Sequence, residues 1–260
     1  MHSTKPVRSF KADSLNVRIY ESGAALGRAA ADFVAGALGS AIRRHGSANL
    51  VLATGASQFA FLDAFKRDPS VEWPKVTVFH LDEYLGMSER HPASFRKYLR
   101  ERILDEVRPA SVHFLLGDAP DAEAETARYE ALLKAHPVHV ACIGIGENGH
   151  IAFNDPAVAD FDDPRLVKVV HLDEACRRQQ LGEGWFRTLG DVPTRALSLT
   201  IPAIMGCGVI SCAVPDRRKA EAVRNALLGP VHAACPASVL RRHPDATLFL
   251  DPESAGLLRP

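Results

Sequence analysis

Short apolar runs alternate along the chain with longer segments in which apolar residues recur every three or four positions. The clearest of the longer segments spans residues 23–44, where Leu26, Val34 and Leu38 fall on one stripe of a helix. Further segments of this kind predict helices at residues 57–65, 94–107, 121–134, 216–228 and 236–242. The short apolar runs predict buried strands at residues 17–20, 49–53, 76–81, 112–115, 138–145, 166–172, 196–201, 209–214 and 246–250.

Strands that alternate with helices of this length are typical of a mostly parallel sheet with helices on both faces. In such sheets, ligands bind beyond the carboxyl ends of the strands. That rule selects three loops, at residues 54–58, 82–86 and 146–156, and the same loops hold the residues with the most suggestive chemistry.

The first loop contains Thr54, Gly55, Ala56 and Ser57 and joins a strand to a helix. Backbone N–H groups at the start of a helix attract anions, the two small residues allow close approach, and Ser57 can donate from its hydroxyl. The loop is therefore a candidate phosphate site. The alternative is an ordinary strand-to-helix turn that Ser57 caps.

The second loop begins with two adjacent carboxylates, Asp82 and Glu83, directly after an apolar strand. Carboxylates in such a place are unfavourable unless they face a cleft or have partners. Because the end of a strand fixes the position of the side chains that follow it, one of the two is a candidate general base. The alternative is that they cap a helix or face solvent.

The third loop contains His150, with the hydrogen-bond acceptors Glu147, Asn148, Asn154 and Asp155 near it in sequence. A histidine beside a carboxylate can act as an acid or a base near neutral pH, although a lone loop histidine is more often only a surface residue. The glycines of this loop lack the spacing of a dinucleotide-binding motif. Together the three loops suit proton transfer on a sugar phosphate, with an anion site, a carboxylate base and a histidine that opens the ring.

Composition limits the classes of partner. Among 260 residues, 31 basic and 31 acidic side chains give a formal net charge of zero, which argues against binding to nucleic acid or an anionic membrane through bulk charge. No run is expected to be long and apolar enough to span a bilayer, and residues 1–14 lack the pattern of a secretory signal. The five cysteines lack the spacing of metal or redox motifs, so we expect a cytoplasmic protein with buried thiols and no metal.

Several longer motifs resemble the glucosamine-6-phosphate deaminase/isomerase family, whose superfamily includes 6-phosphogluconolactonase. The resemblance covers about residues 50–251, and its motifs are LDEY at 81–84, HP at 91–92, SF at 94–95, GHIAFNDP at 149–156, DVPTRAL at 191–197 and KAEA at 219–222. It implies a single Rossmann-like, doubly wound α/β domain over residues 1–260 that uses no cofactor and no metal. The implied reaction converts glucosamine 6-phosphate to fructose 6-phosphate and ammonia.

The same resemblance assigns roles to individual residues. Asp82 would carry a proton between C2 and C1 of the opened sugar. His150 would assist ring opening, with Asp155 as its partner where the family has the longer glutamate. The first loop would hold the phosphate, and Lys219 would supply the counter-charge. The alternative for Lys219 is a solvated lysine on a helix, since two arginines precede it.

Two further positions depart from the family's pattern. Asn148 stands where the family has an aspartate; its amide can accept a hydrogen bond from the histidine ring but carries no charge, and the adjacent Glu147 is the candidate to supply one. The family's phosphate-binding arginine aligns near Gly184, so Arg177 or Arg178 is the candidate replacement. These departures are consistent with a diverged branch that acts on a different sugar phosphate, or with a slow deaminase.

Two other functions remain open. Proteins that hydrolyse 6-phosphogluconolactone tend to have an arginine at the position of Tyr84 and to lack the Asn-Asp-Pro found here at residues 154–156, so both positions favour the aldose–ketose reaction. A sugar-phosphate-binding regulator would need neither Asp82 nor His150, although Asn148 is consistent with one. The expected partners are a small sugar phosphate and, as one option, further copies of the chain.

Overall fold

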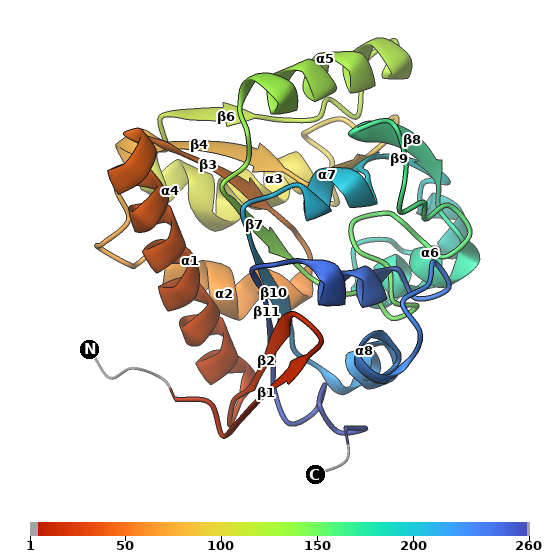
Figure 1. Ribbon diagram of the computed structural model, residues 1–260. Coiled ribbons are helices and arrows are strands. Elements are labelled where there is room, and N and C mark those ends of the chain that lie inside the picture. The colour runs from red at the N-terminus through yellow and green to blue at the C-terminus, as the bar shows by residue number, and fades with distance from the viewer. Residues whose placement is uncertain (1–4, 259–260) are drawn as a thin grey trace.

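A computed structural model of the protein describes residues 5–258. This part of the chain forms a central eight-stranded sheet (Figure 1), in which all neighbouring strands are parallel except β1 and β2. The strand order is β1 (Arg8–Ala12), β2 (Leu15–Ile19), β11 (Ala246–Leu250), β10 (Val209–Val214), β7 (Val140–Ile143), β3 (Ala48–Leu52), β4 (Val76–His80) and β6 (Ser111–His113). The mostly parallel α/β fold predicted from the sequence is confirmed.

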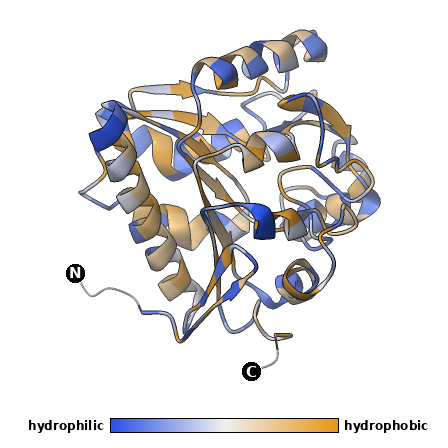
Figure 2. Ribbon diagram, in the orientation of Figure 1, coloured by the Kyte–Doolittle hydropathy of each residue, from blue (hydrophilic) through white to orange (hydrophobic). Residues whose placement is uncertain are grey.

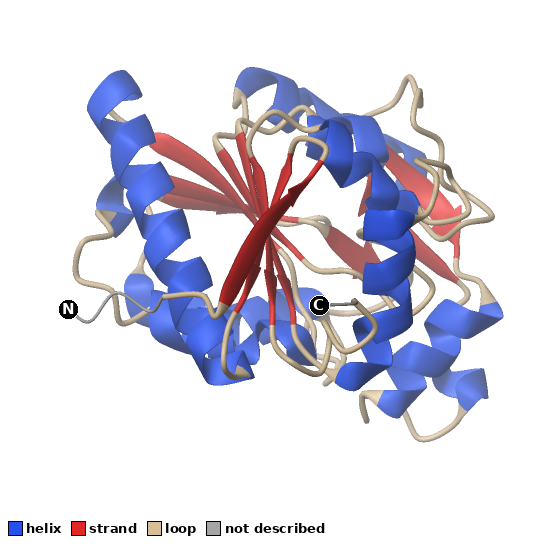
Figure 3. Cartoon of the chain, turned by 60° about the horizontal axis from the view of Figure 1, so that its bottom comes forward, coloured by secondary structure: helices blue, strands red, loops and turns tan. Residues whose placement is uncertain are grey.

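Helices cover both faces of this sheet. Successive side chains of each strand point to opposite sides, so both faces carry apolar residues that must be buried. In β3, Leu50 and Leu52 belong to the core on one face, whereas Val51 belongs to the core on the other. The first face is covered by α1 (Gly23–His45), α2 (Phe59–Phe65), α3 (Phe95–Leu99), the π-helical turn η3 (Arg100–Leu104) and α4 (Asp105–Val107). The second face is covered by α5 (Ala122–Ala135), α7 (Ile201–Met205), α8 (Ala220–Leu228) and the 3₁₀ segment η6 (Pro236–Arg242). Figure 2 shows apolar residues along the central strands, and Figure 3 shows the strands between the two helical layers.

Two of the predicted helices begin with a tighter turn at the edge of the sheet. The helix predicted at 57–65 starts with the 3₁₀ turn η1 (Ala56–Gln58), and the helix predicted at 216–228 starts with the 3₁₀ turn η5 (Arg217–Lys219). Each turn lies shortly after a central strand, β3 or β10. The first residues of both helices therefore lie at the carboxyl edge of the sheet.

The helix α1 corrects the expectation that no segment is long and apolar enough to span a membrane. By length and composition alone, its 23 residues meet that criterion, because many of them are alanines. In the structure, 61% of its most apolar window is buried within the protein. Its Phe33 ring, for example, lies 5.5 Å from the ring of Phe249 in β11. The apolar stripe of α1 is thus part of the core.

A second sheet, of three antiparallel strands in the described residues, has the order β5 (Asp82–Tyr84), β9 (Arg195–Leu199) and β8 (Val167–His171). Leu81 joins the two sheets, since its N–H donates to the Leu52 carbonyl (3.2 Å) and its carbonyl accepts from the Leu199 N–H (3.0 Å). Two expectations are therefore wrong. Residues 82–86 begin with a strand instead of a loop, and the runs at 166–172 and 196–201 belong to this sheet and not to the parallel one.

Further elements were not predicted from the sequence. They are β1, α6 (Glu174–Gly182), α7 and the 3₁₀ turns η2 (Trp73–Lys75) and η4 (Leu189–Asp191). The strand β1 is mostly polar because it lies at the edge of the sheet, and α6 has few apolar residues to mark a helical period.

The order of the central strands reverses between β3 and β7. From β3 the chain runs outward through β4 to β6, and it then returns to β7 and runs the other way through β10 to β11. At such a reversal the loops that follow the two strands turn to opposite faces and leave a crevice between them. The loops at residues 54–57 and 146–156 border this crevice.

Gly27 provides a test of the packing between α1 and α2. A Cβ at this position would lie 2.5 Å from the backbone carbonyl carbon of Ala60. We expect Gly27→Ala to lower the free energy of unfolding by about 1–3 kcal/mol because the two helices must move apart, as measured by urea denaturation. Gly36→Ala is the control: it lies on the exposed side of the same helix with open space around it and should raise the free energy by about 0.5–1 kcal/mol. A stabilising Gly27→Ala would contradict the close contact.

Candidate active site

A pocket opens where the strand order reverses. Three of the segments that line it are those selected from the sequence, and the others are the start of α3, α6 and the turn η5. Its polar and charged lining side chains are Thr54, Ser57, Asp82, His150, Gln179, Gln180, Glu183 and Lys219. The fold therefore brings together the first loop, one carboxylate, the histidine and the lysine that sequence patterns indicated.

The first loop borders the pocket, and its residues are half-buried. Gly55 has a φ of 95°, a conformation that disfavours every residue with a Cβ, so this position requires glycine. The carbonyl of Gly55 accepts a hydrogen bond from the Tyr98 hydroxyl at 2.8 Å, which holds the loop against α3. Thr54, Gly55 and Ser57 line the pocket directly, and Ala56 begins the turn η1 behind them.

Asp82 is the first residue of β5 and faces the pocket with 6% of its surface exposed. Burial, and secondarily the negative charge of Glu83, raise the pKa of Asp82 well above its usual range. Among the described residues no group donates a hydrogen bond to its carboxylate to offset that rise. A carboxylate of this kind is a stronger base than an ordinary aspartate, which suits a group that must take a proton from carbon.

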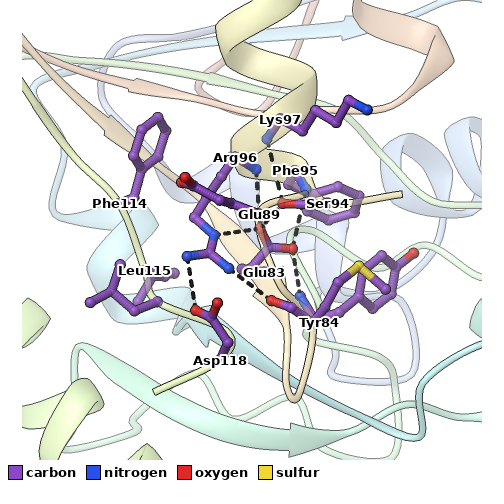
Figure 4. A network of polar contacts seen from close by, with 12 residues as sticks. Glu83, Tyr84, Glu89, Ser94, Phe95, Arg96, Lys97, Phe114, Leu115 and Asp118 are labelled. Atoms are coloured by element: carbon purple, nitrogen blue, oxygen red, sulfur yellow. Dashed lines mark hydrogen bonds and ion pairs between the residues drawn. The ribbon is translucent and has the colours of Figure 1, made fainter. Parts of the chain in front are cut away.

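Glu83 does not line the pocket, which corrects its place among the candidate site residues. As the next residue of the strand it points to the opposite side, where it is fully buried. Its carboxylate accepts hydrogen bonds from residues at the start of α3 (Figure 4). Glu83 therefore holds the start of α3 beside the pocket and does not face the pocket itself.

His150 and Asp155 form a buried pair at the edge of the pocket. The imidazole Nδ1 lies 2.9 Å from Asp155 Oδ1, an ion-pair contact whose N–H is not well aligned with the oxygen. Burial would raise the pKa of Asp155, but its contacts with His150, with the Asn148 amide and with the Asp173 N–H outweigh that effect and lower it. Asp155 is therefore ionised near neutral pH and reaches the imidazole despite its short side chain. Gly146 packs against the ring so closely that a Cβ there would overlap it.

Asn148 does not contact the histidine ring, contrary to expectation. Its side-chain oxygen accepts from the backbone N–H of His150 at 3.1 Å. Its NH₂ group donates to Asp155 Oδ1 at 2.9 Å and to Asp173 Oδ2 at 3.2 Å. The backbone donor fixes the orientation of the amide, so the NH₂ group must face the two carboxylates. A neutral donor at this position reduces their mutual repulsion.

Lys219 lies at the end of the turn η5 with only 4% of its surface exposed. Burial lowers the pKa of its ammonium group, and the carboxylates of Glu147 and Glu183 oppose that effect. Glu147 Oε1 lies 3.9 Å from Lys219 Nζ and 3.6 Å from a guanidinium nitrogen of Arg218. The lysine is therefore not a solvated surface residue, and Glu147 pairs with cations instead of serving as the partner of His150.

Neither of the two candidate replacements for the family's arginine lines the pocket. Arg178 is exposed and pairs with Glu174 on the outer side of α6. Arg177 donates to the carbonyls of Leu189 and Val192. The expectation that one of them reaches the phosphate is not met in this conformation, since both guanidinium groups are held outside by other partners.

The side of α6 that faces the pocket instead carries two amides and a carboxylate that sequence analysis missed. Gln179 accepts from the Glu147 N–H at 2.8 Å and donates to Glu183 Oε1 at 3.1 Å. Gln180 accepts from the Tyr84 hydroxyl at 2.7 Å, which leaves its NH₂ group for the pocket. The available signal was Asp173, whose carboxylate caps the start of α6 as a helix N-cap residue does.

Three side chains near the pocket lie close enough to hold a metal ion. Ligand atoms of His150, Asp155 and Cys176 all lie within 4.8 Å of one another. Burial raises the pKa of the Cys176 thiol, so the sulfur keeps its proton, and Asp155 is already paired with His150. The chemistry of this donor set is therefore poor for a cation.

Sequence comparisons relate the chain to enzymes of one family. A family described as glucosamine-6-phosphate isomerases/6-phosphogluconolactonase matches residues 21–249. A glucosamine-6-phosphate deaminase of Exiguobacterium sibiricum is 38% identical over 207 residues, which cover 80% of each chain. A glucosamine-6-phosphate deaminase of Listeria monocytogenes serotype 4a is 39% identical over 210 residues, which cover 80% of this chain and 87% of the relative.

Solved structures give the same relationship. A monomeric glucosamine-6-phosphate deaminase superposes with a TM-score of 0.83 at 31% identity, covering 93% of this chain and 99% of that one. A 6-phosphogluconolactonase from Shewanella baltica superposes with a TM-score of 0.75 at 20% identity, covering 90% and 97%. The second similarity extends to the fold alone.

The pKa of Asp82 predicts that its removal stabilises the protein. Because this pKa is raised on folding, the contribution of Asp82 to stability is present at low pH and is lost as the pH rises through the folded-state pKa. We therefore expect Asp82→Asn to raise the Tm at pH 7 by about 2–4 °C and to have less effect near pH 4. Asp155→Asn is the opposite control: the pKa of Asp155 is lowered, so this variant should lower the Tm at pH 7. Thermal melts at both pH values measure these effects. A lower Tm for Asp82→Asn than for wild type at pH 7 would contradict the raised pKa of Asp82.

Asn148 offers a second test, because a carboxylate at this position would face Asp155 and Asp173. We expect Asn148→Ala to lower the free energy of unfolding by roughly 1–3 kcal/mol through the loss of buried hydrogen bonds. Asn148→Asp should be less stable than Asn148→Ala at pH 8, because it adds a like charge, and should recover as the pH falls to 5 and the added carboxylate takes up a proton. Urea denaturation at the two pH values measures both effects. An Asn148→Asp variant as stable as wild type at pH 8 would mean that residue 148 does not bridge the carboxylates.

Proposed function

Because the chain belongs to the glucosamine-6-phosphate isomerase/6-phosphogluconolactonase family, we propose that it is an enzyme that converts glucosamine 6-phosphate to fructose 6-phosphate and ammonia. The observation that carries the proposal is that Asp82 and His150 face one pocket together with Lys219 and the 54–57 loop. Relatives named for this reaction are 38–39% identical to the chain over about 80% of its length.

The phosphate group would bind at the end of the pocket formed by the first loop and Lys219. Backbone N–H groups at the start of η1 and the hydroxyl of Ser57 are available as donors, and the buried ammonium of Lys219 supplies the charge. The free NH₂ group of Gln180 adds a neutral donor on the α6 side. This proposal replaces the missing arginine by one buried lysine and an amide.

Ring opening requires a proton to reach the ring oxygen and another to leave the C1 hydroxyl. His150 is placed for this exchange, because its Nδ1 faces the ionised Asp155 and the ring lines the pocket. The carboxylate stabilises the imidazolium that forms when the ring takes up a proton.

Asp82 would then take the proton from C2 of the open sugar and return it to C1. The first transfer, with a proton taken up at O1, gives an enolamine, and the second, with a proton lost from nitrogen, gives an imine at C2. Water adds to this imine carbon, and ammonia leaves with the formation of fructose 6-phosphate. Asp82 suits both transfers because its raised pKa makes it a good base when ionised and a modest acid when protonated.

A lactonase or a regulator without catalysis fits less well. Hydrolysis of a lactone needs no proton transfer at carbon, and the solved lactonase named above is only 20% identical to this chain. A regulator would have no use for the desolvated Asp82. We further propose that the protein is one domain and that it acts in the cytoplasm. The second proposal is supported by the five cysteines, which all lie in the described residues as free thiols, four of them buried.

The assay of ammonia release from glucosamine 6-phosphate tests this function. We expect wild type to release ammonia and Asp82→Asn to be slower by about 10²–10⁴-fold, because it removes the base, while inorganic phosphate still binds to both. With substrate deuterated at C2, wild type should transfer deuterium to C1 or exchange it with solvent. Faster hydrolysis of 6-phosphogluconolactone than release of ammonia would overturn the proposal, and so would full activity of Asp82→Asn.

A further inference from the structure

The two adjacent carboxylates at the start of β5 have opposite surroundings. Asp82 lines the pocket without a hydrogen-bond donor among the described residues. Glu83 lies on the other side of the strand, and its side chain is completely buried. Their separation on the two sides of one strand means that Glu83 cannot touch a substrate in the pocket, although its charge is next to Asp82.

Glu83 accepts five hydrogen bonds, which Figure 4 shows converging on its carboxylate. Oε1 accepts from the backbone N–H groups of Tyr84 (2.9 Å) and Phe95 (3.2 Å). Oε2 accepts from the Ser94 hydroxyl (2.9 Å) and from the backbone N–H and Nε–H of Arg96 (3.0 and 3.3 Å). The five donors favour the ionised form of the Glu83 carboxylate, while burial works against them and raises its pKa.

Arg96 completes this network from the other side. Its side chain is 3% exposed, and it donates to the Met87 carbonyl at 2.8 Å. A second guanidinium nitrogen lies 3.0 Å from Asp118 Oδ1 at the surface. The guanidinium group is thus held in place by three partners, so its charge remains next to Glu83.

The same contacts fix one wall of the pocket. Four of the five donors to Glu83 come from residues 94–96, which hold the start of α3 against β5. Phe95 in this segment lines the pocket, and its ring lies 4.9 Å from the ring of Tyr84 and 5.8 Å from that of Phe153. Glu83 therefore determines the position of Phe95 as well as the direction of the strand that carries Asp82.

We propose that Glu83 is a positioning residue for the reaction: held by Arg96 and the start of α3, its buried charge acts on Asp82 from the opposite side of β5. This inference rests on the proposed function only in that Asp82 is the base.

The consequence is a pH dependence that passes through Asp82. A negative charge on Glu83 favours the protonated form of Asp82, so loss of that charge must let Asp82 ionise at lower pH. Other titratable or charged groups also surround Asp82 from the elements packed against it, and they remain in place when Glu83 changes. They are His80, Tyr84, Tyr129, His150, Cys176, Glu183 and Lys219.

Glu83→Gln tests the proposal because it keeps the shape of the side chain and removes its charge. We expect the acid limb of kcat/KM for glucosamine 6-phosphate to move to lower pH and kcat at the plateau to fall by about tenfold, because Asp82 becomes a weaker base. KM should change by less than about twofold, because Glu83 does not line the pocket and glutamine keeps the shape of the side chain beside Phe95. In parallel, NMR of protein labelled with ¹³C at the aspartate carboxyl groups follows Asp82 directly, with its signal assigned from Asp82→Asn. The titration of that signal should move to lower pH in Glu83→Gln.

Glu125→Gln is the matched control. Glu125 is also buried (4% exposed) and also pairs with an arginine, Arg128, but it lies on α5 and does not line the pocket. Its substitution should lower the Tm and leave both the acid limb and the Asp82 signal unchanged. If Glu83→Gln does not fold because Arg96 is left buried without its partner, the double variant Glu83→Gln/Arg96→Gln removes both charges. It should move the Asp82 titration in the same direction.

The outcomes separate this proposal from the proposed function. An Asp82 titration that is the same in wild type and Glu83→Gln, or one that moves equally in Glu125→Gln, overturns the role of Glu83. If wild type releases no ammonia, the proposed function fails, while the carboxyl titration still decides whether Glu83 acts on Asp82.

Discussion

The geometry of the site depends on the two backbone hydrogen bonds of Leu81. Its N–H belongs to the parallel sheet through Leu52, and its carbonyl belongs to the antiparallel sheet through Leu199. Between these bonds the chain leaves one sheet and enters the other, so the next residue, Asp82, lies at the mouth of the crevice between β3 and β7. If the strand continued in the parallel sheet, the carboxylate at its end would not be turned toward this crevice.

Two carboxyl groups in and beside the pocket have opposite surroundings. Among the described residues, Asp82 accepts no hydrogen bond, and burial raises its pKa. Asp155 accepts hydrogen bonds from its neighbours, and these contacts lower its pKa. A pair of carboxyl groups with opposite pKa shifts is typical of sites that move protons. Asn148 contributes to the same arrangement, because its NH₂ group donates to both Asp155 and Asp173 and reduces the repulsion between them.

The order of strands and helices was predictable because each buried element repeats its apolar residues with its own period. The partners of the strands were not, since β8 and β9 are as apolar as the central strands and only long-range pairing places them in a second sheet. In the site, Asp82 and His150 were found from the segments that carry them and Lys219 from the resemblance to the family, whereas Gln179 and Gln180 lie on a polar helix without a recognisable stripe. The contacts of Asn148 and Arg178 could not be inferred from their neighbours in sequence, because they depend on Asp173 and Glu174 being at the start of that helix.

The early position of α1 has a consequence for synthesis of the chain. This helix is apolar enough to resemble a membrane-spanning segment, and part of the surface that covers it comes from β10 and β11, at residues 209–250. A ribosome must therefore add more than 160 residues after α1 before those strands exist. During that interval part of the apolar surface of α1 stays uncovered, and exposed apolar surface of this kind promotes aggregation. The apolar stripe of α1 is therefore fully covered only after the last strands of the central sheet have been synthesised and have folded.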